Sequence, residues 1–378
     1  MKKKKFIIFI GFLTFILYNC ISFNKKLNFI LITLDTQRAD FISVYSPANS
    51  YTPNIDWFAK NGIFFENCYS LIPITLPSHA TIFYSKPPWK LRIYNNGEIF
   101  KSERKKSLAE IFKKRGYITS AFVSLGVLTK KYGLTKGFDT YIDKFPESRW
   151  YLTAEEINSR VFPWLEKNRN KKFFLWIHYM DTHFPYFSFI DLFKSNYKFH
   201  KQSLKRILFK SFLYYSGVGS FDIQSGKNFL ESLYVREIEY LDFCIKTLIE
   251  GFEDLGILQD SLLIFTSDHG ESFYEHGNIG HMSGLYNENL KIPLLMLLEE
   301  ERGVSNSHVS LIDLAPTILS MLNIKQPISF HGKDMFVGGK REIIAEHAAI
   351  DLANFKVLDD SLAVACIVDN WKLIVSLS

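Results

Sequence analysis

Three continuous apolar runs lie along the chain, and each one ends abruptly in polar residues. They cover residues 27–34, 173–177 and 261–266. Runs of this kind are typical of parallel strands that are buried on both faces of a sheet. Asp35 follows the first run directly, and the other two lead into the clusters HYMDTH and SDHG. The pattern predicts three buried strands whose carboxyl ends carry polar chemistry.

Between these runs, apolar residues recur at helical spacing behind clear start signals. Ser107 and Glu110 form a capping box for a helix that Gly116 ends, and Thr153 and Glu156 form a second one. Helices that alternate with strands at this spacing predict an α/β architecture.

Two segments depart from this alternation. Residues 187–226 are rich in Phe, Tyr, Lys and Arg, which predicts an inserted lid or rim on the main domain of residues 27–340. This segment is either a solvated amphipathic helix or a part that grips substrate or touches a membrane. Residues 341–378 are expected to be a short carboxyl-terminal segment that completes the sheet.

The amino terminus has the pattern of a targeting segment. Residues 2–5 are four lysines, residues 6–17 are apolar, and Cys20 follows. This order is typical of a lipoprotein signal peptide over residues 1–20, and the apolar run is shorter than the ~20 residues that span a bilayer. We expect export to the bacterial periplasm or cell surface with lipid attachment at Cys20. An uncleaved signal anchor and simple secretion are the alternatives.

Composition excludes some classes of protein. The chain is 47% hydrophobic over 378 residues, so it can bury a large core and is not globally disordered. Its formal net charge is +6, but the four amino-terminal lysines supply four of those charges, so nothing points to nucleic acid. Cys68, Cys244 and Cys366 have no CxxC spacing and are expected to be buried free thiols.

Residues 73–84, PITLPSHATIFY, place the hydroxyl of Thr75 just before an expected helix with Pro77 in its first turn. The first turn of a helix carries unpaired N–H groups and partial positive charge, so it is a natural place to hold phosphate or sulfate. Taken alone, these residues fit a simple helix cap better than a ligand site.

The polar residues after the strands should meet, because ligands of open α/β sheets bind at the carboxyl ends of the strands. Asp35, Asp268 and His269 offer two carboxylates and an imidazole, and Thr75 adds a hydroxyl oxygen as a fourth ligand. This donor set favours one divalent ion, zinc or manganese, over calcium, which prefers oxygen ligands. A bound ion lowers the pKa of the threonine hydroxyl and makes it a nucleophile.

Five further side chains belong to the predicted site. His183 and His281 are expected to be catalytic, because they can neutralise oxygens of the transferred group or protonate the leaving oxygen. His178, Asp181 and His79 are expected to bind substrate. A second metal ion held by Asp181 and His183, with His178 or His281, is an open alternative. The GxSxG, Walker, HExxH and GxGxxG motifs do not occur, so the chemistries that they carry fit poorly.

These motifs resemble the sulfatase branch of the alkaline phosphatase superfamily. The resemblance runs over most of the chain and rests on segments such as NFILITLDTQRAD, TLPSHATIF, FFLWIHYMDTHFPY, FTSDHGESFYEHG and VSLIDLAPTIL. It implies an α/β fold, a three-layer sandwich around a large mixed, mostly parallel sheet, with a small C-terminal part. It also implies metal ligands at Asp35, Asp268 and His269, a nucleophile at Thr75, and contact between His183 and the substrate oxyanion. His281 lies at the spacing where many relatives have a catalytic lysine or histidine.

The chain departs from this family at two positions. Sulfatases convert a Cys or Ser at the nucleophile position to formylglycine, whereas Thr75 would give a ketone, so no formylglycine is expected. Phosphodiesterases and phosphoethanolamine transferases of the superfamily use threonine, which favours phosphate over sulfate esters here. Thr36 replaces the second aspartate of the usual pair, which disfavours calcium further without excluding it.

The sequence therefore predicts a metal-dependent ester hydrolase with Thr75 as its nucleophile. Its expected substrate is a sulfated or phosphorylated small molecule, glycan or lipid, and its expected membrane contact is the amino-terminal anchor. The alternatives are a sulfuric ester hydrolase proper that uses Thr75 directly, a phosphoethanolamine-type transferase, and a catalytically silent binding lipoprotein.

Overall fold

The computed structural model describes residues 27–48, 51–103, 106–184, 186, 223–281, 284–298, 301–339, 341–351 and 356–377. The predicted signal peptide and Cys20 lie outside these residues and stay predictions. The predicted lid also lies outside them, except at its end, where residues 223–226 begin the long helix α9. In the part that the structure describes, no helix combines the length and the apolar character that crossing a membrane requires.

A large mixed sheet forms the centre of the fold, in the strand order β11-β2-β10-β6-β1-β5-β3-β4, with the short β9 beside β2. Five strand pairs are parallel, and the three pairs that involve β9 or β10 are antiparallel. The strands are β1 (Asn28–Leu34), β2 (Ile63–Tyr69), β3 (Ile118–Phe122), β4 (Thr140–Ile142), β5 (Phe173–Tyr179), β6 (Ser261–Ser267), β9 (Lys291–Ile292), β10 (Leu294–Leu297) and β11 (Gly303–Ser310). The three predicted central strands, β1, β5 and β6, are neighbours and parallel.

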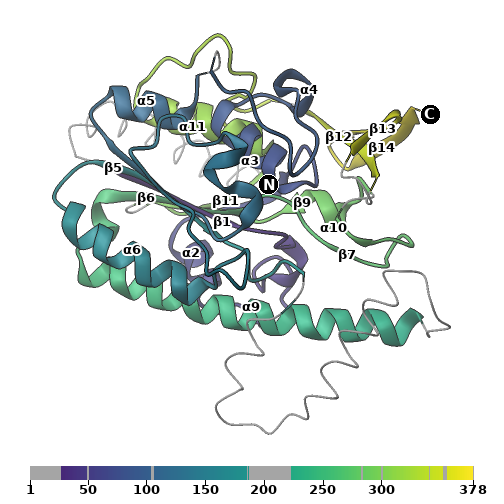
Figure 1. Cartoon of the computed structure of the whole chain (residues 1–378), viewed down its shortest axis with the longest axis horizontal. Helices are drawn as coiled ribbons and strands as arrows, with labels where there is room; N and C mark the ends of the chain where they lie inside the picture. The colour runs from purple at the N-terminus through teal and green to yellow at the C-terminus, as the bar shows by residue number, and fades with distance from the viewer. Residues whose placement is uncertain are drawn as a thin grey trace, which may run out of the picture.

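Helices cover both faces of this sheet (Figure 1). The longer ones are α2 (Ile55–Asn61), α3 (Thr75–Tyr84), α5 (Leu108–Lys114), α6 (Ala154–Asn168), α9 (Ile223–Asp254) and α11 (Leu314–Met321). Strand β1 shows why there are two cores: Phe29 and Leu31 pack with α3, α5 and α11, while Ile30 and Ile32 pack with α2, α6 and α9. Both faces of β1 are therefore buried, and the predicted three-layer α/β sandwich is confirmed.

Short elements connect these layers. They are α4 (Pro88–Leu91), α10 (Asn287–Leu290), the 3-10 turns at Ala39–Phe41, Gly126–Leu128, Lys130–Tyr132, Leu258–Asp260 and Leu311–Asp313, and the hairpin of β7 (Ser272–Phe273) and β8 (Ile279–Gly280). Both predicted capping boxes are present at α5 and α6. Cys68 and Cys244 are buried free thiols as predicted, whereas Cys366 is only partly buried.

The prediction that residues 341–378 complete the main sheet is wrong. Strands β12 (Glu342–Asp351), β13 (Lys356–Val368) and β14 (Trp371–Leu377) form an antiparallel sheet of their own. The edge beside β2 is already occupied by the parallel strand β11. Ile343 and Ala345 of β12 pack instead on Tyr69 and Leu71, next to the loop that leads to Thr75.

Candidate active site

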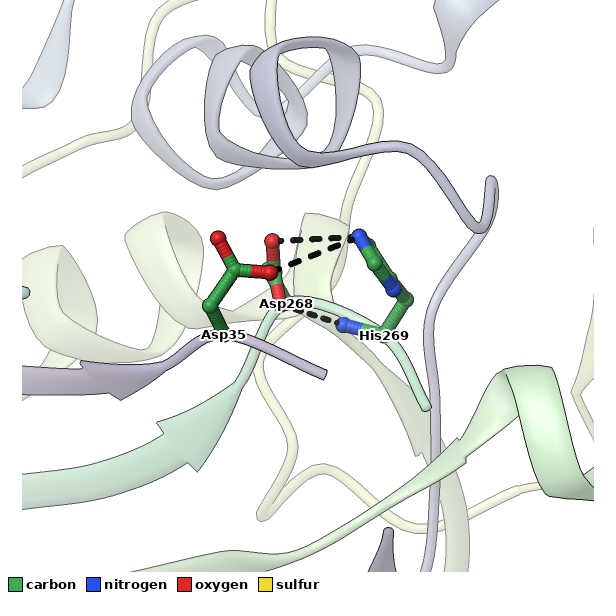
Figure 2. Close-up of side chains that lie close together, drawn as sticks. All are labelled: Asp35, Asp268 and His269. Atoms are coloured by element: carbon green, nitrogen blue, oxygen red, sulfur yellow. Dashed lines mark hydrogen bonds and ion pairs between the residues drawn. The ribbon is translucent and has the colours of Figure 1, made fainter. Parts of the chain in front are cut away.

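The ends of β1 and β6 bring two carboxylates and one imidazole together. Leu34 pairs with Ser267 in the parallel register, so Asp35 and Asp268 leave the sheet side by side. One ligand atom from each of Asp35, Asp268 and His269 lies within 4.8 Å of the others, and all three residues are 0% exposed. Figure 2 shows these three side chains pointing toward one another.

The hydrogen bonds around this cluster leave metal-binding atoms free. Oδ1 of Asp268 accepts the backbone N–H groups of Thr36 and His269, at 3.1 and 2.8 Å. Its Oδ2 and both oxygens of Asp35 are buried without a hydrogen-bond partner. Nδ1 of His269 lies 3.0 Å from the carbonyl of Gly270, where it donates, so Nε2 keeps a lone pair toward the carboxylates. Buried atoms of these types fit a divalent cation such as zinc or manganese.

The electrostatics of the cluster also fit a cation. Burial raises the pKa of Asp35, and burial together with the charge of Asp35 raises the pKa of Asp268 well above its usual range. Burial, with the neighbouring His281, lowers the pKa of His269 far below 6.5, so its ring is neutral as a metal ligand must be. A cation here compensates both carboxylates, which the surrounding protein does not.

Thr75 is the first residue of α3 and faces this cluster. Its Oγ1 lies 3.4 Å from Nε2 of His269, and the residue is 0% exposed. Ser78, one turn further along α3, donates its hydroxyl to the backbone carbonyl of Asp268 at 2.7 Å. This bond ties the start of the helix to the end of β6, so the hydroxyl of Thr75 is held against the predicted ligands.

The amino end of α3 is less open to an anion than the sequence predicts. The N–H of Leu76 donates to the side-chain oxygen of Asn96 at 2.9 Å, and Pro77 has no N–H group. The N–H of Ser78 is bonded to the carbonyl of Ile74. Sequence reasoning missed Asn96, because the only local signal is an Asn-Gly turn, which says nothing about a contact 20 residues away.

The two predicted catalytic histidines lie together beside the cluster. The ring of His281 is 4.5 Å from the ring of His269 and 5.2 Å from the ring of His183, measured between centroids. Nδ1 of His281 lies 3.3 Å from a carboxylate oxygen of Glu271. Burial opposes the charged ring, yet Glu271 outweighs it and raises the pKa of His281. Glu271 was also missed, although its position directly after the DHG motif was visible.

The three side chains predicted to bind substrate have protein partners. His79 is fully buried, with its nitrogens 2.8 Å from the carbonyl of Thr75 and 3.1 Å from the hydroxyl of Thr33. Asp181 accepts the first N–H of α6 through Oδ1, at 3.0 Å. These contacts are structural ones, and they give no support to substrate binding by either residue.

His178 lies directly behind Asp35. Its Nε2 is 3.5 Å from Oδ2 of Asp35, and its Nδ1 is 2.9 Å from the hydroxyl of Ser124. Burial lowers the pKa of His178 to about 3, so the ring is neutral. His178 therefore contacts a predicted metal ligand, and this position gives no support to substrate binding. Among the described residues, Asp35, Asp268 and His269 are the single group of three such ligands, and the second metal site gains no support.

Thr36, which replaces an expected aspartate, turns the chain away from β1. Its φ of +56° lies in the left-handed region, which is strained for a β-branched residue. Its hydroxyl donates to the carbonyl of Thr182 at 2.6 Å, and the hydroxyl of Thr182 donates to the carbonyl of Asp35. These reciprocal bonds fix the ends of β1 and β5 together, and the Thr36 hydroxyl faces Thr182 rather than the carboxylates.

The α/β sandwich and the cluster at the ends of β1 and β6 match the architecture and the site that the sequence motifs predict for a sulfatase-like protein. A family model for sulfatases matches residues 27–324, and the chain belongs to the sulfatase family. It is 24% identical over 345 residues to an ulvan-active sulfatase of Formosa agariphila, in an alignment that covers 82% of this chain and 64% of that relative. It is 25% identical over 356 residues to arylsulfatase K of Xenopus laevis, in an alignment that covers 82% of this chain and 65% of that relative. The chain thus spans somewhat less than two thirds of these two proteins.

Solved structures agree with the fold. The phosphonate monoester hydrolase of Agrobacterium radiobacter superimposes with a TM-score of 0.70 at 15% identity, over 93% of this chain and 88% of that one. A protein solved with its substrate D-glucosamine-2-N,6-O-disulfate superimposes with a TM-score of 0.72 at 18% identity, with the same coverage. At these identities the likeness establishes the fold and leaves the substrate to be argued from the site.

Proposed function

We propose that this chain is a metal-dependent ester hydrolase that cleaves phosphate or sulfate esters, with Thr75 as its nucleophile. The observation that carries the proposal is the hydroxyl of Thr75, held 3.4 Å from Nε2 of His269 inside a buried cluster with unpaired carboxylate oxygens. A divalent ion bound by Asp35, Asp268 and His269 would stabilise the alkoxide form of Thr75 and the charge of the transferred group.

The chain's own residues then have distinct roles. The Oγ1 of Thr75 forms a bond to phosphorus or sulfur as the bond to the leaving oxygen breaks, which gives a covalent threonyl ester. His281, whose pKa is raised beside Glu271, holds a proton that the leaving oxygen can take. The ring of His183 contacts that of His281, so His183 lies next to this proton donor. His281 then deprotonates a water molecule, which hydrolyses the threonyl ester and restores Thr75.

The residue type at position 75 favours phosphate esters. Threonine does not provide the aldehyde that sulfatases of this family use, and a direct threonine nucleophile is the chemistry of phosphoester enzymes in the superfamily. The names of the sulfatase relatives support the second candidate, direct cleavage of sulfate esters by Thr75. A sulfated or phosphorylated glycan is consistent with both.

Substitution of the nucleophile tests this proposal. The purified protein should turn over an aryl phosphate, a bis-aryl phosphate or an aryl sulfate, and a chelator should abolish this turnover. Thr75→Ala should lose activity by at least a thousandfold and still bind metal, while Thr75→Ser should retain part of the activity. Thr81→Ala is the matched control, because Thr81 is buried on the same helix and its hydroxyl donates only to the carbonyl of Pro77. Full activity in Thr75→Ala would show that another group attacks, and no turnover in the wild type would leave a binding protein.

A further inference from the structure

Four aromatic rings form a row that leads from the metal-binding cluster to the surface. The centroid of His269 is 4.5 Å from that of His281, which is 5.2 Å from that of His183. The ring of Trp150 comes next, 6.5 Å from His183 and nearly perpendicular to it at 85°. His269 is 0% exposed, whereas Trp150 is 48% exposed, so this ring row runs from the buried site to solvent.

The backbone of Trp150 is held firmly although its indole is exposed. Tyr151 forms a β-bridge with Leu125, and the N–H of Leu152 donates to the carbonyl of Ser124 at 2.9 Å. A Cβ atom on Gly126 would lie 3.2 Å from the carbonyl oxygen of Trp150, so the two backbones are in close contact. Ser124 and Gly126 follow β3 at the active-site edge of the sheet, so the backbone that carries the indole is held at this edge.

About half of the Trp150 indole is open to a ligand at this place. A tryptophan side chain buries about 150–250 Å² in a core, so roughly 100 Å² of this one remains open to water. By contrast, the exposed indole of Trp371 lies on β14, in the separate small sheet. Apolar surface that a fixed backbone presents beside a catalytic group is typical of a substrate contact.

The order of the rings assigns parts of the substrate to them. The transferred phosphoryl or sulfuryl group lies at Thr75 and His269, and the leaving oxygen lies at His281 and His183. The organic part of the ester then extends outward and reaches Trp150. A flat ring covers an indole face, while a thin alkyl chain covers little of it.

We propose that Trp150 is a stacking platform that selects esters of ring-shaped alcohols, that is, of sugars or phenols. This inference rests on the proposed function, because it takes Thr75 as the centre that is attacked. It adds a specificity-determining residue: Trp150 carries the preference for a cyclic leaving group over an acyclic one.

Three esters and three variants test the platform. The esters are 4-nitrophenyl phosphate, glucose 6-phosphate and butyl phosphate, or the matching sulfates if the wild type prefers these. Trp150→Ala should lower kcat/KM for the ring esters about 10- to 50-fold, mainly through KM, and should change butyl phosphate by less than about twofold. Trp150→Phe should restore most of the loss. Trp371→Ala, which removes an indole that is 83% exposed on β14, should change none of the three values.

The outcomes separate this inference from the function beneath it. If the wild type turns over none of the esters, the proposed function fails and the platform with it. If the wild type is active and Trp150→Ala loses as much on butyl phosphate as on the ring esters, the residue supports the site generally and the platform is refuted. Unchanged values in Trp150→Ala refute it as well. A loss on glucose 6-phosphate alone, or on 4-nitrophenyl phosphate alone, identifies the alcohol as a sugar or as a phenol.

Discussion

Replacement of Asp35 by asparagine should have opposite effects on the metal-free and the metal-loaded protein. Both oxygens of Asp35 are buried without a hydrogen-bond partner, and a carboxylate oxygen of Asp268 lies within 4.8 Å. Without a cation, the two acids repel each other when both are ionised, and the raised pKa of Asp268 favours its protonated form, which limits the repulsion. Asp35→Asn removes that repulsion, and it also removes a metal ligand. The variant should therefore be more stable than the wild type in chelator and less stable than the wild type in metal.

The size of both effects follows from the geometry. Two unit charges 4.8 Å apart, the widest spacing within the group of ligand atoms, interact by about 3 kcal/mol at an effective dielectric constant of about 20, and protonation of Asp268 reduces this energy. With an unfolding entropy of about 2.1 cal/mol/K per residue, removal of the full repulsion raises the Tm of the metal-free variant by roughly 4 °C, and partial protonation of Asp268 makes the increase smaller. An ion at a thousandfold excess over its Kd stabilises the wild type by about 4 kcal/mol, and the variant should lose most of this.

Thermal unfolding in chelator and in a series of zinc or manganese concentrations measures both terms. Asp313→Asn is the matched control, because Asp313 is a buried aspartate whose carboxylate has protein partners. It forms an ion pair with Arg341 at 2.9 Å and accepts the N–H groups of Ser310 and Lys333. That variant should lose stability by the same amount with and without metal. If Asp35→Asn instead loses stability in chelator as Asp313→Asn does, Asp35 has a structural partner and is not a metal ligand.

Two further predictions concern residues around the site and in the small sheet. His178→Ala should lower metal affinity about 10- to 100-fold, because Nε2 of His178 is 3.5 Å from Oδ2 of Asp35. His178→Gln should restore most of the lost affinity. Competition with a chelating dye measures the affinities, and equal values in all three proteins would contradict this prediction. Burial raises the pKa of Glu346 to about 7, from 4.5. Its stabilising contribution is therefore complete below about pH 4.5 and is lost as pH rises through about 7. The Tm of Glu346→Gln should lack the decrease that the wild type shows over this range, and parallel Tm curves would refute the shift.

The central strands and the capped helices were predictable, because the local pattern of apolar and polar residues determines them. Continuous apolar runs that end in aspartate identified β1 and β6, and the rule that ligands bind at strand ends then placed Asp35, Asp268 and His269 together. The capping boxes at Ser107 and Thr153 gave correct helix starts for the same reason, since both signals act within a few residues.

Contacts between distant segments could not be predicted in this way. Asn96 meets the N–H of Leu76 only because the loop after α4 folds back over α3, and no periodicity encodes that return. His178 and His79 belong to the same motifs as His183, His269 and Thr75, so spacing cannot tell a histidine that is available to a ligand from one with protein partners. The pattern of strand β12 fits a sheet edge in either sheet, and the structure pairs it with β13, while β11 pairs with β2.

The balance of charge at the site ties substrate binding to the metal. Among the described residues of the cluster and its neighbours, Asp35, Asp268 and Glu271 are acids, and His281 is the one histidine whose pKa is raised. Burial lowers the pKa of His79 and His178 to about 3, so both rings are neutral. A phosphate or sulfate ester brings further negative charge to a site that, without a cation, has no excess of positive charge to receive it. Under the proposed function, a divalent ion would bind the anion as well as activate Thr75, and its removal should raise KM in addition to slowing the chemical step.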